Sequence, residues 1–168
     1  MRVAGLEIRA ARPDETVAIA QTHVRADGET YRPIFGARFA AVDPATSLAR
    51  WEAAFVAGDE LLVADEDGAI VGLIHASETW MSALYILASH QRRGLGRMLL
   101  AELSQRLAAR GVRQIGFQCV ADNANARAFY AAMGAELVGR KQEGEGEGAW
   151  EEVVFSLEVD APIALLRR

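Results

Sequence analysis

The sequence is poor in the features that mark several classes of protein. It contains one cysteine, Cys119, so an intrachain disulfide cannot form and a cysteine-rich structural zinc site is excluded. Its longest apolar runs, such as residues 69–74, are far too short to span a bilayer. Residues 1–5 lead into a strand pattern without the apolar region of a signal peptide. We therefore expect a cytoplasmic protein with no membrane partner and no metal site.

Positive charge is not in excess either. Lys and Arg number 18 against 23 Asp and Glu, and the formal net charge of −5 argues against a nucleic-acid partner. The length of 168 residues, with 51% hydrophobic and 24% charged residues, is typical of one globular domain with a sizeable core. We expect a single domain over residues 1–160 and a C-terminal tail at residues 161–168.

The hydrophobic pattern predicts the element order β-α-α-β-β-β-α-β-α-β-β. The predicted strands cover residues 6–12, 61–65, 69–77, 81–88, 115–120, 136–142 and 151–158, and the predicted helices cover about 14–25, 44–57, 94–110 and 123–134. Residues 27–43 are expected to be irregular or short-helical because Gly28, Pro33 and Gly36 interrupt them. This order predicts an α/β fold, with a single mixed, mostly antiparallel sheet of about six or seven strands and helices on both faces.

The stretch from residue 84 to residue 97 combines an apolar strand, a basic turn and the start of a helix. Gly94 and Gly96 allow the backbone to approach a ligand closely, and the first N–H groups of the helix are free to bind an anion. Three arginines add cationic partners for phosphate: Arg92, Arg93 and Arg97. The stretch therefore predicts a pyrophosphate site, although a single pair of glycines is also typical of an ordinary β-to-α turn.

A second motif, at residues 123–134, supports the functional interpretation. Together the two stretches resemble the GCN5-related N-acetyltransferase (GNAT) superfamily over roughly residues 60–140. The first stretch matches the Gln/Arg-x-x-Gly-x-Gly/Ala loop of that superfamily at Gln91, Gly94 and Gly96. The second matches its Asn-x-x-Ala-x-x-Phe-Tyr-x-x-x-Gly helix at Asn123, Ala126, Phe129, Tyr130 and Gly134.

The resemblance implies acetyl-coenzyme A (acetyl-CoA) as the acyl donor. Its pyrophosphate would lie on the backbone amides of residues 92–97, and its pantetheine amides would pair with the strand end at residues 84–86. The N–H of Ile86 would polarise the thioester carbonyl, and Asn123 would cap its helix and bind the pantetheine or phosphate part. The implied coenzyme-binding residues are Leu84, Tyr85, Ile86, Gln91, Arg92, Arg93, Gly94, Leu95, Gly96, Arg97, Asn123 and Tyr130.

Tyr130 is the candidate proton donor. The resemblance places it where a tyrosine protonates, or at least hydrogen-bonds, the departing coenzyme sulfur, and a phenol with a pKa near ~10 is protonated at neutral pH. The alternative is an aromatic side chain packed on one face of its helix.

The general base is less well defined. Some superfamily members place a Glu in the strand that corresponds to residues 115–120, but this chain has Gln118, which cannot act as a base. Glu78 is the best candidate, although a Glu beside a turn is commonly just solvated. His75 has a suitable intrinsic pKa but falls on the face opposite Glu78 if the strand is straight. Binding of the small neutral fraction of the amine, without any base, also stays open.

The acceptor pocket is expected to come from residues 23–39 and from the acidic Gly/Glu loop at residues 143–149. His23, Tyr31 and Phe35 are the candidate pocket residues, with packing as the alternative for His23. Glutamates of the loop can attract a cationic amine, but a flexible, solvated hairpin tip is the alternative.

These observations predict an N-acetyltransferase that moves an acetyl group to an amine by direct attack in a ternary complex. A small-molecule amine is favoured over a protein N-terminus or lysine because no extended charged groove is evident. A non-catalytic acyl-CoA sensor is the alternative from another class. A homodimer is also possible. A nucleotide-binding domain is disfavoured because the chain has neither Gly-x-x-x-x-Gly-Lys-Ser/Thr nor Gly-x-Gly-x-x-Gly.

Overall fold

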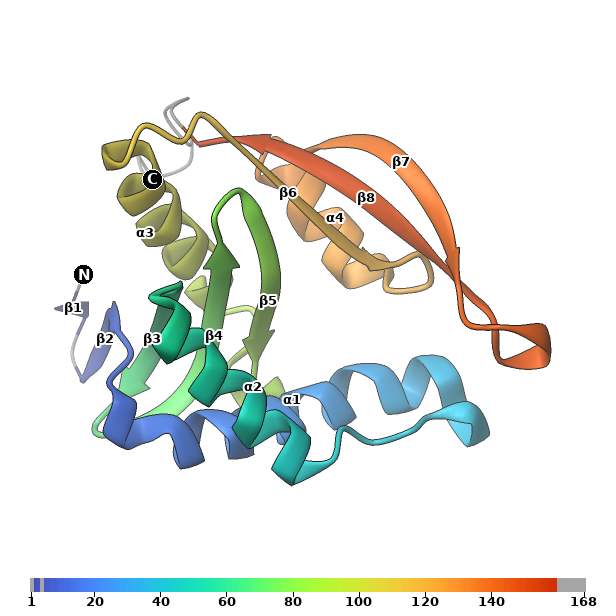
Figure 1. Cartoon of the computed structure of the whole chain (residues 1–168), viewed down its shortest axis with the longest axis horizontal. Coiled ribbons are helices and arrows are strands. Elements are labelled where there is room, and N and C mark those ends of the chain that lie inside the picture. The colour runs from blue at the N-terminus through green and yellow to red at the C-terminus, as the bar shows by residue number, and fades with distance from the viewer. Residues whose placement is uncertain (1, 4, 160–168) are drawn as a thin grey trace. The chain divides into compact units, whose positions relative to one another are not determined.

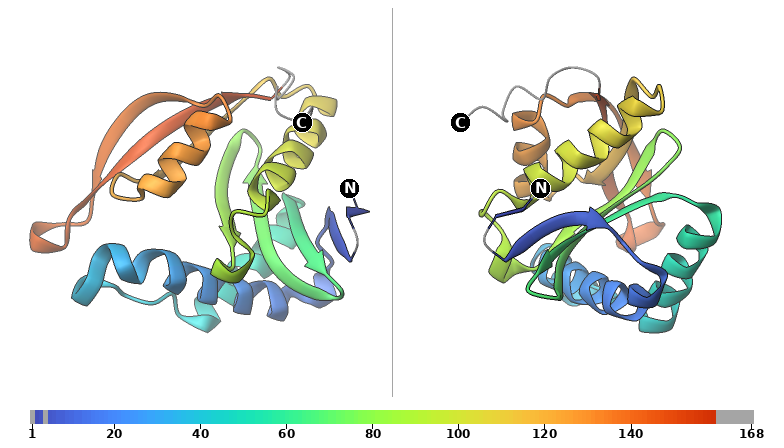
Figure 2. Two further views of the ribbon diagram at one scale, coloured as in Figure 1. Left: turned by 180° about the vertical axis from the view of Figure 1, so that it is seen from behind. Right: turned by 90° about the vertical axis from the view of Figure 1, so that its left-hand side faces the viewer.

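The computed structural model describes residues 2–3 and 5–159 (Figures 1 and 2). The strands are β1 Arg2–Val3, β2 Leu6–Ala10, β3 Glu60–Glu66, β4 Ala69–Ser77, β5 Trp80–Ile86, β6 Gln114–Val120, β7 Glu136–Glu143 and β8 Trp150–Glu158. The α-helices are α1 Thr16–Phe35, α2 Pro44–Ala57, α3 Leu95–Ala109 and α4 Ala124–Ala132; the 3₁₀ turns are η1 Pro13–Glu15, η2 Gly36–Arg38, η3 Ala88–His90 and η4 Gly146–Gly148. The strand order is β1-β2-β3-β4-β5-β6-β8-β7, with β5 and β6 parallel. The predicted α/β fold class is confirmed, and the short β1 is an addition to the predicted order.

The chain forms two compact units. Among the described residues, the first comprises residues 2–3, 5–78 and 82–103, and the second comprises residues 79–81 and 104–159. A single domain over residues 1–160 stays a prediction, and the predicted tail at residues 161–168 lies outside the described residues.

The main core of the first unit lies where α1 and α2 cover one face of its strands. Ile19 of α1, Trp51 of α2 and Leu73 of β4 are fully buried there. Side chains alternate along a strand, so Leu62 of β3 points to the other face and is also fully buried. Figure 2 shows the beginning of α3 on that face. Leu99 of α3 is also fully buried. Burial on both faces explains why these strands are almost continuously apolar.

The helix α1 is longer than the sequence predicts. It runs for 20 residues, from Thr16 to Phe35, and passes through Gly28 and Pro33. The prediction of an irregular or short-helical stretch over residues 27–43 is therefore wrong for residues 27–35, whereas residues 36–38 form the short helix η2 and residues 39–43 are irregular. Its buried side continues past the predicted end as far as Asp27, and Pro33 lies in its last turn, where a lost backbone hydrogen bond matters least. Packing of the buried side outweighs the weak helix propensity of glycine. No described helix, α1 included, is both long and apolar enough to cross a membrane.

The β3–β4 hairpin forms where the sequence predicts it. Asp67 and Gly68 have φ angles of 52° and 89°, the left-handed pair that a type I′ turn requires. Glu66 pairs with Ala69 across the turn. The Asp-Gly signal therefore fixes the turn and the pairs next to it, whereas an irregularity between Ala64 and Asp65 shifts the register over the rest of the hairpin.

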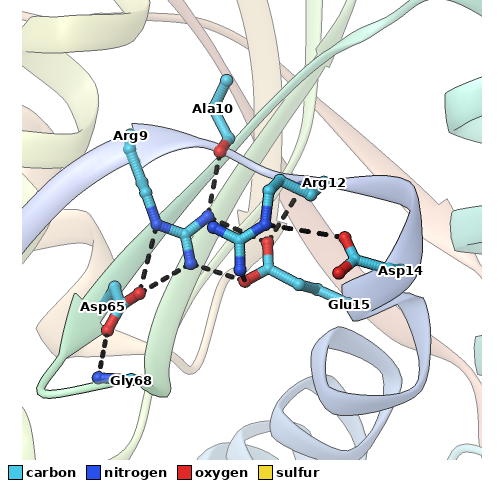
Figure 3. Close-up of polar contacts among 7 residues, drawn as sticks. All are labelled: Arg9, Ala10, Arg12, Asp14, Glu15, Asp65 and Gly68. Atoms are coloured by element: carbon cyan, nitrogen blue, oxygen red, sulfur yellow. Dashed lines mark hydrogen bonds and ion pairs between the residues drawn. The ribbon is translucent and has the colours of Figure 1, made fainter.

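A charge cluster joins the start of α1 to the sheet of the first unit (Figure 3). Arg9 of β2 donates to Asp65 Oδ2 at 2.6 Å and to Glu15 Oε2 at 2.8 Å. The hydrogen bond from Arg9 lowers the pKa of Glu15 despite its partial burial. Burial alone would raise the pKa of Asp65, but hydrogen bonds from Arg9 and from the N–H of Gly68 lower it overall. One guanidinium thus holds two carboxylates.

Replacing Arg9 with methionine is expected to destabilise the protein by about 2 kcal/mol at pH 7, because two neighbouring carboxylates lose their shared partner. The folded pKa values of Glu15 and Asp65 are lowered. Their contribution to the free energy of unfolding is therefore complete above the pKa values of the unfolded state, near ~4, and is lost as the pH falls through the pKa values of the folded state. Urea unfolding at several pH values measures the difference, which should shrink below about pH 4.

Arg140 provides the matched control. It pairs with Glu151 at 2.7 Å, but its side chain is 54% exposed, so Arg140→Met should cost at most about 0.5 kcal/mol. Equal losses of stability in the two variants would contradict a specific role for Arg9 in holding the two carboxylates. A loss of stability in Arg9→Met that does not depend on pH would contradict it as well.

The second unit is built on β6, β8 and β7. β6 pairs with β8 along its whole length, from Gln114 opposite Glu158 to Val120 opposite Glu152. The short turn η4 lies in the β7–β8 connection, which contains the acidic loop. Trp80 pairs with Gly116, and a Cβ added at Gly116 would lie 2.7 Å from the Trp80 ring. Glycine is therefore needed where this ring covers β6.

Candidate active site

The predicted pyrophosphate loop connects β5 to α3 in the first unit. Arg92 and Gly94 both have left-handed φ angles, of 61° and 85°. A Cβ added at Gly94 would have nothing within 4 Å, so the loop is open at this point. α3 then begins at Leu95, and the N–H groups of its first turn have no partner within the helix. An open loop that leads into a helix N-terminus suits a pyrophosphate group.

Several side chains hold this loop in place. Glu66 at the end of β3 accepts from Arg93 Nη2 at 2.6 Å and lies 2.9 Å from His90 Nε2. Gln91 Nε2 donates to the carbonyl of Ile86 at 3.1 Å. The backbone N–H of Ala88 donates to Glu29 of α1 at 2.7 Å. Arg93 and Gln91, predicted as coenzyme ligands, thus also have structural partners, which pre-organise the loop.

The remaining predicted loop residues differ in what they can offer a ligand. Leu95 is 1% exposed, so its backbone alone can face a ligand. Arg92 has an exposed side chain that makes no ion pair within the described part of the chain. Gly96 and Arg97 lie in the first turn of α3, where both backbone and cationic groups suit an anion.

The end of β5 lies close against β4. Leu84, Tyr85 and Ile86 are half-buried. A Cβ added at Gly72 of β4 would lie 3.0 Å from the carbonyl oxygen of Tyr85 and 3.2 Å from Ile86 Cγ1. Gly72 therefore permits the close approach that sets the backbone of residues 85 and 86, where the pantetheine arm is expected.

The extended α1 aligns the predicted acceptor residues. His23, Tyr31 and Phe35 lie at intervals of four or eight residues along α1, in a row that turns by about 40° around the helix for every four residues. The Tyr31 and Phe35 rings are 6.0 Å apart. His23 is 2% exposed, lies 2.8 Å from Ser47 Oγ and contacts the ring of Tyr85. Burial, helped by the charge of Arg50, lowers the pKa of His23 to about 4, so it is a neutral packing residue at neutral pH.

Asp27 completes this α1 row, and the sequence analysis missed it. It is 6% exposed, and within the described residues its carboxylate accepts one hydrogen bond, from the Tyr85 hydroxyl at 3.3 Å. Burial raises its pKa even though that hydrogen bond lowers it. Its four-residue spacing from His23 and Tyr31 was the available signal, hidden by the expected helix break at residue 27. A buried carboxylate with so few partners suits a cationic ligand.

A hydrogen-bonded series of three side chains lies on the same unit. His75 of β4 lies 2.6 Å from Ser82 Oγ through Nδ1 and 2.9 Å from Asp59 Oδ2 through Nε2. Arg50 Nη2 donates to Ser82 Oγ and to its carbonyl, both at 3.0 Å. His75 was a candidate base from its sequence position, but no pattern in the sequence points to Asp59 or Ser82, which come from different elements.

Glu78, the predicted base, lies in the turn before β5 and is exposed, with a φ angle of 52°. The glycine loop follows the other end of this seven-residue strand. At about 3.3 Å per residue, β5 separates the two by roughly 20 Å. The structure therefore does not bring Glu78 to the loop.

The predicted residues of the second unit are largely buried. Asn123 is the N-cap of α4, as expected, and its side chain accepts from the N–H of Ala126 at 3.0 Å. Tyr130 is 7% exposed and packs against Phe117, with ring centroids 4.5 Å apart. Cys119 is buried, and burial raises its pKa to about 11, so it is an unreactive core residue.

Comparisons with known proteins assign the family. The sequence model of the acetyltransferase (GNAT) family matches residues 28–135, which span both the glycine loop and the α4 motif. The chain belongs to the GNAT acetyltransferase family. Its members are acyltransferases, and this confirms the resemblance seen in the sequence. No curated protein is detectably similar to the chain in sequence.

Solved structures of GNAT acetyltransferases share the fold. yncA from Salmonella typhimurium, solved with acetyl-CoA, is 22% identical, with 94% of this chain and 95% of that chain covered and a TM-score of 0.71. Ribosomal-protein-alanine N-acetyltransferase from Brucella melitensis is 23% identical, with 90% and 99% covered and a TM-score of 0.73. The PaiA N-acetyltransferase from Thermoplasma acidophilum, in complex with coenzyme A, is 15% identical, with 91% and 98% covered and a TM-score of 0.70.

Proposed function

We propose that this GNAT acetyltransferase moves an acetyl group from acetyl-CoA to the amine of a small cationic molecule. Asp27 carries this proposal, because it is a buried carboxylate with a single long hydrogen bond. It lies on the α1 row that includes Tyr31 and beside Tyr85, whose backbone belongs to the predicted pantetheine strand. The guanidinium of Arg50 acts on Asp27 through its charge without a hydrogen bond, whereas an ammonium group would pair with the carboxylate directly. The aromatic rings would pack against a small apolar body.

The donor side rests on the loop and on β5. When bound, acetyl-CoA supplies an acetyl thioester. The N–H groups around Gly94 and the start of α3 would bind its pyrophosphate, with Arg92 and Arg97 as cationic partners. The backbone at residues 84–86 would orient its pantetheine arm. Asn123 would bind the pantetheine or phosphate part, and Tyr130 would protonate the coenzyme sulfur, as the family resemblance implies. A cytoplasmic location and a homodimer stay predictions.

Two other functions, acetylation of a protein and coenzyme sensing, fit the residues of this chain less well. A ribosomal-protein alanine is the acceptor named for the Brucella melitensis relative, but Gln118 stands where such enzymes place a Glu. A coenzyme sensor that does not transfer the acetyl group would need the loop but no acceptor site. The buried carboxylate of Asp27, which suits a cationic acceptor, therefore argues against a sensor.

Two measurements test the proposal together. Calorimetric titration with acetyl-CoA and with desulfo-CoA measures binding, and thiol release is then measured with small cationic amines, neutral amines and peptides. We expect micromolar binding and thiol release with small cationic amines. Binding without release would favour the sensor, release with peptides alone would favour a protein acceptor, and a lack of binding would refute acetyl-CoA as the donor.

Tyr130→Phe is expected to lower kcat about tenfold, because the thiolate leaves without a proton from the phenol. The Kd for acetyl-CoA should change less than twofold, since the ring and its packing are kept. Steady-state kinetics and calorimetry separate the two. Phe129→Leu, a change at the neighbouring aromatic residue, is the control, and an unchanged kcat in Tyr130→Phe would refute proton donation.

A further inference from the structure

A directed hydrogen-bond series runs from α2 through β5 and β4 to the α2–β3 connection. Arg50 of α2 donates to Ser82 Oγ at 3.0 Å, Ser82 Oγ lies 2.6 Å from His75 Nδ1, and His75 Nε2 lies 2.9 Å from Asp59 Oδ2. These residues all belong to the first unit. Ser82 is exposed and lies two residues before the strand end at residues 84–86, whereas His75 is 6% exposed.

The chemistry of the end groups sets the direction of each hydrogen bond. An ionised carboxylate can only accept, so His75 Nε2 carries the hydrogen that faces Asp59. A neutral imidazole then has a free lone pair on Nδ1, which accepts the hydroxyl hydrogen of Ser82. Arg50 can only donate and therefore occupies one of the two lone pairs of Ser82 Oγ. The second lone pair has no partner among the described residues.

From this geometry we infer that Ser82 and His75 relay the proton of the acceptor amine, with Asp59 and Arg50 as positioning residues. The inference rests on the proposed function and names its base. The acceptor binds as an ammonium ion, and one of its protons passes to Ser82 Oγ while the hydroxyl proton of Ser82 passes to His75 Nδ1. The neutral nitrogen then forms a C–N bond at the thioester carbonyl, and the C–S bond breaks as the thiolate leaves. Tyr130 protonates the thiolate, and the second proton lost by the nitrogen restores the phenol. Ser82 ends as a hydroxyl and His75 as an imidazolium beside the Asp59 carboxylate. His75 then returns the proton to water.

The charges around His75 suit a proton acceptor. Burial lowers its pKa below the ordinary 6.5, the carboxylate of Asp59 opposes this shift, and the guanidinium of Arg50 adds to it. His23 of α1, which also contacts the Trp51 ring, is neutral at neutral pH. His75 is therefore neutral and ready to accept a proton at pH 7, and Asp59 stabilises the cation that forms.

The pH profile of kcat separates a relay from a merely structural hydrogen bond. The test uses the intact protein, saturating acetyl-CoA and a primary amine with a pKa above 9. The wild-type kcat should be level between pH 7 and pH 9. In Ser82→Ala and His75→Asn, transfer is limited to the fraction of bound acceptor that has lost its ammonium proton without the relay, so their kcat should be about 100-fold lower at pH 7 and rise about tenfold per pH unit.

Matched variants isolate the hydroxyl group. Ser82→Thr keeps the hydroxyl and should restore the level profile, whereas Ser77→Ala, at the end of β4, should match the wild type throughout. The double variant of Ser82→Ala and His75→Asn should lose no more than either single variant, because the two residues act as one unit. A uniform loss with an unchanged profile would show a structural role and overturn the relay.

Two measurements do not depend on turnover. Nitrogen NMR of the imidazole rings, without coenzyme or acceptor, should show His75 as the Nε2–H tautomer with a midpoint below 6.5. An Nδ1–H tautomer would overturn the relay. Intact mass after incubation with acetyl-CoA alone should show no acetyl group on the unfolded protein, and an acetyl ester on Ser82 would replace the relay by a covalent intermediate. If no amine is acetylated, the proposed function fails, and the NMR result still decides whether the relay exists.

Discussion

Gly94→Asn is expected to weaken acetyl-CoA binding about 300-fold, close to 3.4 kcal/mol. Gly94 has a φ angle of 85°, and a side chain there would enter the open space of the loop. Asparagine tolerates this backbone conformation better than other non-glycine residues, so the fold should survive. The new side chain instead occupies the space in which the pyrophosphate would approach the amides of α3. Calorimetric titration with acetyl-CoA measures the loss.

Gly111→Asn is the matched control, because Gly111 has a φ angle of 82° and the same open surroundings, beyond the other end of α3. The two variants should lose similar free energies of unfolding, of about 1 kcal/mol each. Coenzyme affinity should fall only in Gly94→Asn. Equal affinities of the two variants for acetyl-CoA would show that the loop does not bind the coenzyme.

Asp27→Asn is expected to raise the KM for a cationic acceptor about 100-fold, since the ammonium loses the one buried charge that it pairs with. The KM for acetyl-CoA should stay within twofold. Stability should hold or rise, because burial raises the pKa of Asp27 and the ionised carboxylate therefore opposes folding at neutral pH. Steady-state kinetics and urea unfolding on the same samples measure both effects.

The pH dependence and a control sharpen this prediction. As the pH falls, Asp27 becomes protonated and the wild type should bind the acceptor less tightly. Because the pKa of Asp27 is raised, this weakening should begin at a higher pH than it would for an Asp with an ordinary pKa. Asp27→Asn should lose this dependence. Asp14→Asn, at the exposed entry to α1, is the control and should leave the KM unchanged. An unchanged KM for the cationic acceptor in Asp27→Asn would show that Asp27 does not bind the acceptor.

The sequence by itself determined the parts of this protein that depend on short-range chemistry. Asp67-Gly68 specifies a turn because both residues can adopt left-handed φ angles, and Asn123 specifies the start of α4 because its side chain caps a free N–H group. The two family motifs are equally local. They could therefore be found from the residues alone, together with the acyltransferase family that they indicate.

Only the tertiary structure decided the length of α1 and the partners of the buried polar residues. Gly28 and Pro33 locally favour a break, but burial of the α1 face against the sheet outweighs them and brings Asp27 to Tyr85. Ser82, His75 and Asp59 meet through strand pairing and a helix-to-strand connection, which no spacing in the sequence reveals. Local propensities are properties of neighbouring residues, whereas such contacts depend on the packing of the whole unit.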